Sequence, residues 1–132
     1  MATTTATITI SSSDLTGDAL SLSSTATLTK AGNATGLDQT TGVARKFAGA
    51  QTSFNLIAAS DYTADKAHKV YIKNTSTSNS EFITVELGGS NVSLGRLYGG
   101  DFLFVPYDGN NDIDIDTSDV NMTVEYLVIY EA

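Results

Sequence analysis

The chain has 132 residues, about the size of one domain that buries a single hydrophobic core. It has no cysteine, which excludes disulfides and thiolate chemistry and suits assembly in a reducing cytoplasm. Its net charge is −8 and its seven Lys and Arg residues are scattered, so we expect no direct binding to nucleic acid.

Hydropathy along the chain predicts no association with a membrane. No stretch approaches the ~18 consecutive apolar residues of a membrane span. The amino terminus also lacks the basic and apolar segments of a secretory signal.

The first two apolar segments alternate with a period of two residues. Ala6, Ile8 and Ile10 share one parity, and threonines stand between them. Between residues 20 and 28, leucine and alanine again alternate with serine and threonine. The pattern predicts two half-buried strands whose outer faces carry hydroxyl groups.

Residues 31–42 are rich in turn-forming residues and poor in apolar ones, which predicts a loop. Loops of this length are uncommon inside a compact domain and often make contacts. We therefore expect a single β domain over residues 1–132, in which residues 1–42 form an extended arm and loop that contacts other subunits.

The rest of the chain continues as short strands separated by turn signals. Residues 60–69 are the exception, since Ser60 is a suitable cap for one or two helical turns. Pro106 is expected to end its strand, and residues 102–105, apolar on both parities, are expected to be covered on both faces. The last segment is the most apolar and predicts a central strand. Strands are expected at residues 43–47, 52–57, 69–74, 82–87, 92–98, 102–105, 112–117 and 121–130.

This pattern of elements predicts the fold class. About eight to ten short strands with little helix indicate an all-β fold, a single-domain antiparallel β-sandwich or a jelly-roll-like domain.

Few residues are candidates for catalysis. His68 is the single histidine, and its polar neighbours predict that its side chain is exposed. The sequence also has no Gly-x-Ser-x-Gly motif whose serine a histidine could activate. Glu81 with Glu86, or Asp112 with Asp114, are the obvious carboxylate pairs for acid–base chemistry. A glycosidase cleft lined by aromatic residues is not expected in a short chain without tryptophan. We therefore expect no enzymatic activity.

An acidic row is the clearest local motif. Asp112, Asp114 and Asp116 alternate with Ile113 and Ile115, so strand geometry places the three carboxylates on one face. Two interpretations stay open: an acidic edge that discourages strand pairing, which we favour, or a calcium site with these three aspartates as ligands. No other cofactor is expected, because the glycine-rich segments match no phosphate-binding motif.

The second half of the chain resembles small virion proteins of tailed phages, notably those of marine and cyanobacterial hosts. The similarity lies in the tract Lys69-Val-Tyr-Ile-Lys-Asn74, the strand of residues 81–87, the segment Leu94-Gly-Arg-Leu-Tyr-Gly-Gly-Asp101-Phe-Leu-Phe-Val-Pro106, the Asp-Ile-Asp-Ile-Asp motif and Val124-Glu-Tyr-Leu-Val-Ile-Tyr130. The resemblance implies a β-sandwich or jelly-roll-like subunit, commonly a homotrimer. It also implies a decoration or cement protein on the capsid, which binds the major capsid protein and is located in the virion after synthesis in the host cytoplasm.

Two other functions remain open on the sequence. A tail-fibre or receptor-binding head domain would also be rich in β-strands and trimeric. A bacterial carbohydrate-binding or adhesin-like module would present exposed aromatic residues on one face.

Overall fold

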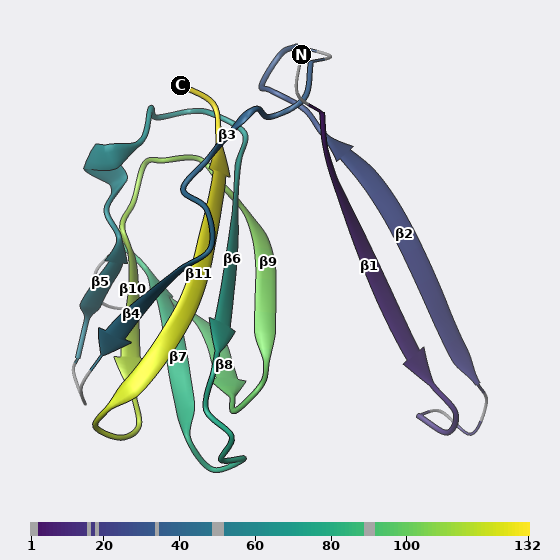
Figure 1. Ribbon diagram of the computed structural model, residues 1–132, viewed down its shortest axis with the longest axis vertical. Coiled ribbons are helices and arrows are strands. Elements are labelled where there is room, and N and C mark those ends of the chain that lie inside the picture. The colour runs from purple at the N-terminus through teal and green to yellow at the C-terminus, as the bar shows by residue number, and fades with distance from the viewer. Residues whose placement is uncertain (1–2, 16, 18, 34, 49–51, 89–91) are drawn as a thin grey trace. The chain divides into compact units, whose positions relative to one another are not determined.

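The computed structural model describes residues 3–15, 17, 19–33, 35–48, 52–88 and 92–132, with the side chains of residues 47 and 48 excepted. The chain divides into two compact units, residues 1–38 and residues 39–132 (Figure 1). The expected arm over residues 1–42 corresponds in extent to the first unit, which ends four residues earlier.

The first unit is a β-hairpin. Strand β1 (Thr4–Ser12) pairs antiparallel with β2 (Leu20–Leu28), with Thr4 opposite Leu28 and Ser12 opposite Leu20. The chain after β2 closes back on the hairpin, because the backbone N–H of Leu37 donates to the carbonyl of Leu28 at 2.8 Å. The side chains of Leu28 and Leu37 are both buried.

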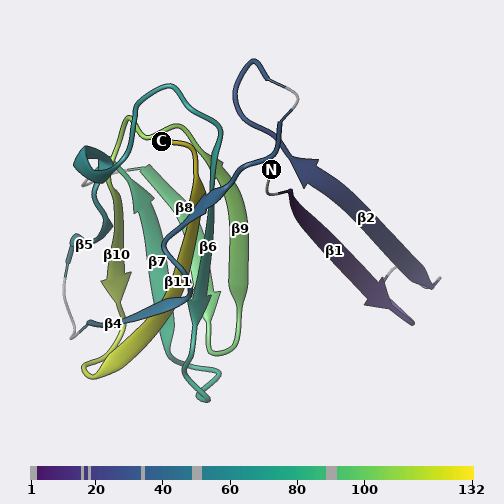
Figure 2. The same cartoon turned by 45° about the horizontal axis from the view of Figure 1, so that its top comes forward.

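The second unit is an antiparallel β-sandwich, seen as two layers in Figure 2. We name the layers after their most central strands. The β10 sheet has the order β5 (Phe54–Ile57), β10 (Ile113–Thr117), β7 (Phe82–Leu87) and β8 (Val92–Tyr98). The β11 sheet has the order β3 (Gln39–Thr40), β11 (Met122–Tyr130), β6 (His68–Asn74) and β9 (Phe102–Tyr107), and β4 (Ala44–Ala48) also pairs with β11.

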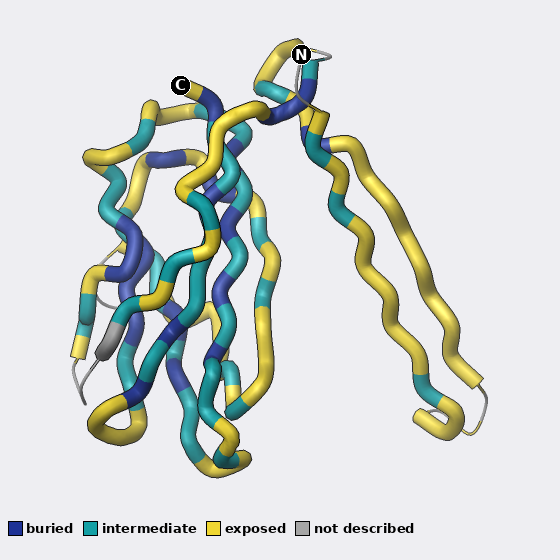
Figure 3. The backbone as a smooth tube through the Cα atoms, in the orientation of Figure 1, coloured by how far each residue is buried: buried dark blue, intermediate teal, exposed yellow. Residues whose placement is uncertain are grey.

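The hydrophobic core lies between these two sheets. Alternate residues of β6 and β11 face those of β7 and β10, and the tube of Figure 3 alternates between buried and intermediate positions along β6 and the first part of β11. The apolar side chains of this core with 0 or 1 % exposure come from both layers: Leu56, Val70, Ile72, Ile83, Val85, Ile113, Ile115, Val124 and Val128. The predicted all-β sandwich is therefore confirmed.

Two predicted strands have the expected limits, and two predictions about strand and helix limits are wrong. Strands β7 and β8 span the predicted residues, and β11 is central, as expected. The helix predicted over residues 60–69 is replaced by the 3₁₀ turn η1 (Ala59–Asp61), because residues from His68 onward alternate into the core as β6. Strand β9 continues through Pro106 to Tyr107, since a proline is tolerated on an edge strand.

The expectation that residues 102–105 are covered on both faces is not met within this chain. Phe102 and Phe104 are 59 % and 40 % exposed, whereas Leu103 and Val105 pack against the core. The outward side chains of β9 thus belong to an exposed surface.

Candidate functional site

His68 is buried, with 0 % exposure, which corrects the prediction of a surface histidine. Its Nε2 donates to the carbonyl oxygen of Thr63 at 2.8 Å, and its Nδ1 accepts from the backbone N–H of Glu131 at 3.3 Å. Because Nδ1 is the acceptor, the ring proton belongs on Nε2. Both nitrogens are engaged, so His68 links β6 to the carboxyl-terminal residues and offers no free base.

Three tyrosine rings surround His68 at centroid distances of 5.6 to 6.3 Å: Tyr62, Tyr107 and Tyr130. Burial is the main cause that raises the pKa of Tyr62 to about 12, with Asp61 nearby adding to the effect. Burial likewise raises the pKa of Tyr107 to about 12, with a further contribution from Asp112. Both phenols therefore stay neutral in the ordinary pH range.

Two surface depressions are candidates for binding. One, of about 350 Å³, lies beside the histidine and tyrosine cluster and offers Lys66 and Asp108 to a ligand. The other, of about 310 Å³, lies at the side of the sandwich formed by the edge strands β8 and β9. Its lining is mostly apolar and includes Leu94, Leu97, Leu103 and Val105.

The two candidate carboxylate pairs differ in their surroundings. Glu81 precedes β7 and accepts a hydrogen bond from the hydroxyl of Ser76. Glu86 lies on β7 directly opposite Asp114 of β10. The structure therefore brings Glu86 to the aspartate row and gives Glu81 a separate partner.

The aspartate row lies along β10, with the buried Ile113 and Ile115 directed into the core, as the sequence indicates. Asp112 accepts from the side-chain amide of Asn55 at 3.0 Å and from the backbone N–H of Ala59 at 2.8 Å. Asp116 accepts from the backbone N–H of Ser53 at 2.6 Å. These two carboxylates hold the segment around β5 against β10.

Asp114 is the unusual member of the row. It is only 4 % exposed, and its Oδ1 atom has no hydrogen-bond donor among the described residues. Its cross-strand neighbours are Asn55 on one side and Glu86 on the other. Burial, followed by the charges of Asp112 and Asp116, raises the pKa of Asp114. A buried carboxylate without a donor costs stability when it is ionised.

The donor set fits the calcium prediction only in part. One unpartnered buried oxygen, on Asp114, has the chemistry of a hard-cation ligand. Asp112 has both oxygens engaged, however, and within the described ranges no three acidic or histidine side chains gather closely enough to share a metal ion. The calcium site stays a prediction, and nothing below depends on it.

The hairpin has two chemically different faces. Residues directly opposite in β1 and β2 share a face, and the register places eight hydroxyl residues on one of them. The hydroxyls of Thr7 and Thr25 hydrogen-bond across this face at 2.7 Å. The eight residues of the hydroxyl face are Thr5, Thr7, Thr9, Ser11, Ser21, Ser23, Thr25 and Thr27.

The other face of the hairpin carries its apolar side chains, together with Thr4, Ser12 and Ser24. Ile8, Ile10 and Leu22 are 49, 44 and 47 % exposed, and most of the hairpin has the exposed colour in Figure 3. In the described residues β1 pairs only with β2, so each strand also keeps one free hydrogen-bonding edge. Free edges and apolar faces are the features through which β-structures bind other chains.

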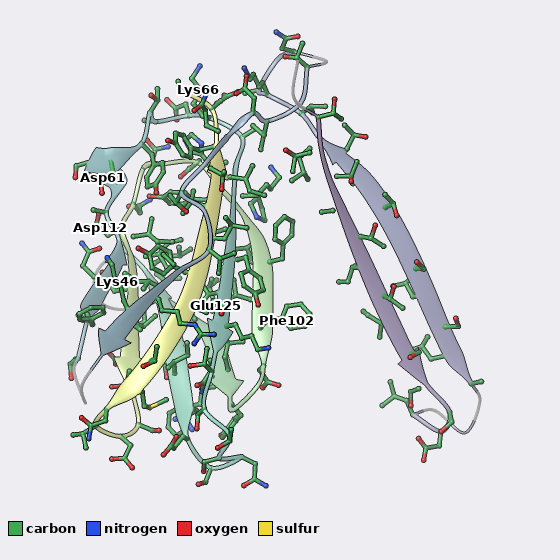
Figure 4. All side chains as sticks on the ribbon, in the orientation of Figure 1. Lys46, Asp61, Lys66, Phe102, Asp112 and Glu125 are labelled. Atoms are coloured by element: carbon green, nitrogen blue, oxygen red, sulfur yellow. The ribbon has the colours of Figure 1, made fainter. Side chains whose placement is uncertain are left out.

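The two outer faces of the sandwich differ in charge. The outward residues of the β11 sheet include Lys69, Lys73 and Arg45 against one acid, Glu125, which pairs with Arg45 at 3.1 Å. The outward face of the β10 sheet carries the aspartate row and Glu86, with Arg96 as its base. In Figure 4, Asp112 lies at the left of the sandwich and Phe102 lies at its right.

Comparisons with protein-family models, with curated proteins and with solved structures return no match for this chain. Over the residues that the structure describes, none of the helices has the length and apolar character needed to cross a membrane.

Proposed function

We propose that the protein is a non-enzymatic structural protein of a tailed-phage virion, a decoration or cement protein that binds the assembled capsid as a homotrimer. The observation that carries the proposal is the chemistry of the hairpin, which has eight hydroxyl residues on one face and the side chains of Ile8, Ile10 and Leu22 on the other. A strand pair with such faces is suited to contacts with other chains.

The hydroxyl face supports contact with a coat protein. Threonine and serine side chains donate and accept hydrogen bonds, so a ladder of them pairs with polar surfaces of varied chemistry. The described residues of β1 and β2 include no charged side chain. Salt screens surface ion pairs, so a contact made by these uncharged strands with a coat protein is not weakened in that way. The face is therefore suited to a contact that persists in changing ionic conditions.

The charge of the sandwich supports a position outside the packaged genome. Residues 39–132 hold twelve acids and six Lys or Arg residues, which gives this unit a charge of −6. An acidic surface is repelled by DNA and by anionic cell surfaces. The engagement of both nitrogens of the single histidine, His68, supports the non-enzymatic part of the proposal.

Particle binding tests this proposal. Deleting residues 2–10 removes most of β1 and is expected to release the protein from purified particles. Replacing Thr7 and Thr25 by alanine is expected to weaken particle binding about tenfold, because the hydroxyl pair is lost. Replacing the same two residues by serine keeps the hydroxyls and is the matched control, with binding close to that of the wild type.

Particles that lack the protein are expected to lose DNA at lower temperature or under osmotic shock. If the protein were found only at the tail tip, and heads without it were equally robust, the cement function would be excluded. The receptor-binding function would then be the better explanation.

A further inference from the structure

The depression beside the histidine and tyrosine cluster plays no part in the proposed capsid contact. We call it the end pocket, because it lies at the end of the sandwich where β11 finishes, and Figure 4 labels Lys66 at this end. Its volume is about 350 Å³, near the lower limit of ligand pockets, which favours a small ligand. The side chains that line it come from the segment before β6, the end of β7, and β9 with the turn that follows: Lys66, Leu87, Pro106, Tyr107, Asp108 and Asn111.

Hydrogen bonds hold the walls of the end pocket in a fixed arrangement. The backbone N–H of Lys66 donates to the carbonyl of Asp108 at 3.3 Å and joins the segment before β6 to the turn after β9. The hydroxyl of Tyr107 donates to the carbonyl of Asn111 at 2.8 Å, which closes this turn on itself. A pocket that is already formed binds its ligand without the cost of ordering loops.

One part of the lining is apolar. Leu87 is half-buried at the end of β7, and Pro106 is exposed on β9. Tyr107 follows Pro106 and keeps its hydroxyl on the carbonyl of Asn111, so the pocket meets the ring of this tyrosine and not a free phenol. Apolar surface of this kind packs against C–H groups of a ligand.

The rest of the lining donates and accepts hydrogen bonds. The ammonium group of Lys66 is a donor, the carboxylate of Asp108 is an acceptor, and the amide of Asn111 is both. Hydrogen bonds from Asn110 lower the pKa of Asp108, which therefore stays an ionised acceptor. The amide of Asn111 reaches the end of β7, since a Cβ added at Gly88 would lie 3.6 Å from its Oδ1.

The charges around the end pocket favour a neutral ligand. The Nζ of Lys66 lies 3.9 Å from the carboxylate of Glu131, and Asp108 adds a second negative charge at the rim. An anionic ligand would meet these two carboxylates, and a cationic ligand would meet the ammonium group of Lys66. A neutral ligand avoids both repulsions.

We infer that the end pocket binds a neutral saccharide, either a free sugar or the end of a longer glycan. The C–H groups of a sugar ring pack on the apolar part of the lining, and its hydroxyls, which both donate and accept, match the mixed groups of the rim. The sugar is bound without chemical change, since both nitrogens of the adjacent His68 are engaged. The pocket lies within residues 39–132, so this inference does not depend on the hairpin or on capsid binding.

Nuclear magnetic resonance titration of the isotope-labelled full-length protein tests the inference. The probes are glucose, galactose, mannose and N-acetylglucosamine. A sugar that binds is expected to shift the backbone amide signals of Ala67, Asp108 and Asn111, with a dissociation constant on the order of 1 mM, because a small polar ligand buries little surface. The absence of saturable shifts with all of these sugars, or shifts confined to the hairpin, would overturn the inference.

Charged derivatives of the sugar that binds best test the argument from charge. Its amino and phosphate derivatives are expected to bind at least about tenfold more weakly than the neutral sugar. If either derivative bound as tightly, a neutral saccharide would be the wrong class of ligand. An oligosaccharide that ends in the same sugar distinguishes the two sources, since a glycan end is the ligand if the oligosaccharide binds as tightly as the free sugar, and the free sugar is the ligand if it does not.

Filling the pocket is expected to abolish binding. Ala67 lines the pocket, so Ala67→Trp places a large side chain in it and is expected to weaken sugar binding at least about tenfold. Ala31→Trp, at an exposed alanine of the first unit, is the matched control and is expected to bind like the wild type. Wild-type affinity in a folded Ala67→Trp variant would place the sugar elsewhere and contradict the inference.

A milder substitution tests the rim without filling the pocket. Asn111→Ala removes the side-chain amide and keeps the backbone carbonyl that accepts from Tyr107. It is expected to weaken sugar binding up to about tenfold, because one or two hydrogen bonds to the ligand are lost. Unchanged circular dichroism shows that the variants fold, and unchanged affinity of Asn111→Ala would count against the assigned rim. Loss of particle binding by a variant that still binds sugar would concern only the proposed function.

Discussion

The hairpin and the sandwich are built from the same alternating pattern and reach opposite degrees of burial. In β6, Val70 and Ile72 are 0 % exposed, because β7 and β10 supply a second layer. In β1, Ile8 and Ile10 remain 49 and 44 % exposed, although they alternate just as regularly. Alternation therefore specifies a strand and its apolar face, while the burial of that face depends on whether a second layer packs against it.

The largest expected effect is the difference in free energy of unfolding between two isoleucine-to-alanine substitutions, one in each unit. Ile72→Ala leaves a cavity in the sandwich and is expected to lower the free energy of unfolding by about 2 to 5 kcal/mol. Ile10→Ala, measured at a concentration low enough to keep the chain monomeric, is expected to change it by less than about 1 kcal/mol. Urea unfolding followed by circular dichroism measures both. Equal losses would mean that the hairpin is packed as tightly as the sandwich.

A smaller difference in stability is expected when one glycine in each unit is replaced by alanine. Gly109 has a φ of +79°, and an added Cβ would lie 2.7 Å from the carbonyl oxygen of Thr63, the acceptor of the His68 hydrogen bond. Gly32 has a similar φ of +68°, but an added Cβ meets nothing within 4 Å.

Gly109→Ala is therefore expected to cost about 2 kcal/mol more than Gly32→Ala, since backbone strain is common to both and the clash is not. Thermal unfolding of the two variants gives the difference. If the two changes proved equal, the packing around His68 would be looser than the distances indicate.

The smallest expected effect depends on pH and is confined to the sandwich. Folding raises the pKa of Asp114, so the folded state holds this proton more tightly than the unfolded state does. Ionised Asp114 therefore destabilises the fold above its raised pKa, and this penalty disappears as the pH falls toward the ordinary aspartate value of about 3.9.

Asp114→Asn is expected to stabilise the protein at pH 7 by on the order of 1 kcal/mol, with a gain that shrinks on acidification. Asp119→Asn, at an exposed residue of the β10–β11 turn, is the control and is expected to show no such trend. Chemical unfolding at several pH values measures the gain. A gain that grew as the pH fell would reverse the assigned direction.

Strand positions were predictable where a regular alternation ended at a clear turn signal. Residues 82–87 and 92–98 meet this condition, and β7 and β8 occupy these residues. The sequence also indicated the hydroxyl faces of the first two strands, because threonine and serine occupy one parity in both.

The polar interior was not predictable, because it depends on contacts between distant residues. His68 stands among polar neighbours in sequence, yet its partners are Thr63 and the backbone of Glu131 at the far end of the chain. Asp114 lies on an outward face and is buried by its neighbours within the sheet and along the strand. The parity of a residue in a strand gives the direction of its side chain, but it does not show how far the neighbouring side chains bury it.

The position of β11 has a consequence for how the protein is made on the ribosome. This strand follows β3, β4 and β6 in the chain, yet all three pair with it. The β11 sheet therefore cannot form until residue 130 has been synthesised, whereas the first unit needs only residues up to 38. A prematurely terminated chain would lack the central strand of this layer and leave its core residues open to the proteases and chaperones that remove unfinished products. Synthesis of this nine-residue strand thus determines whether the β11 sheet of the sandwich can be completed.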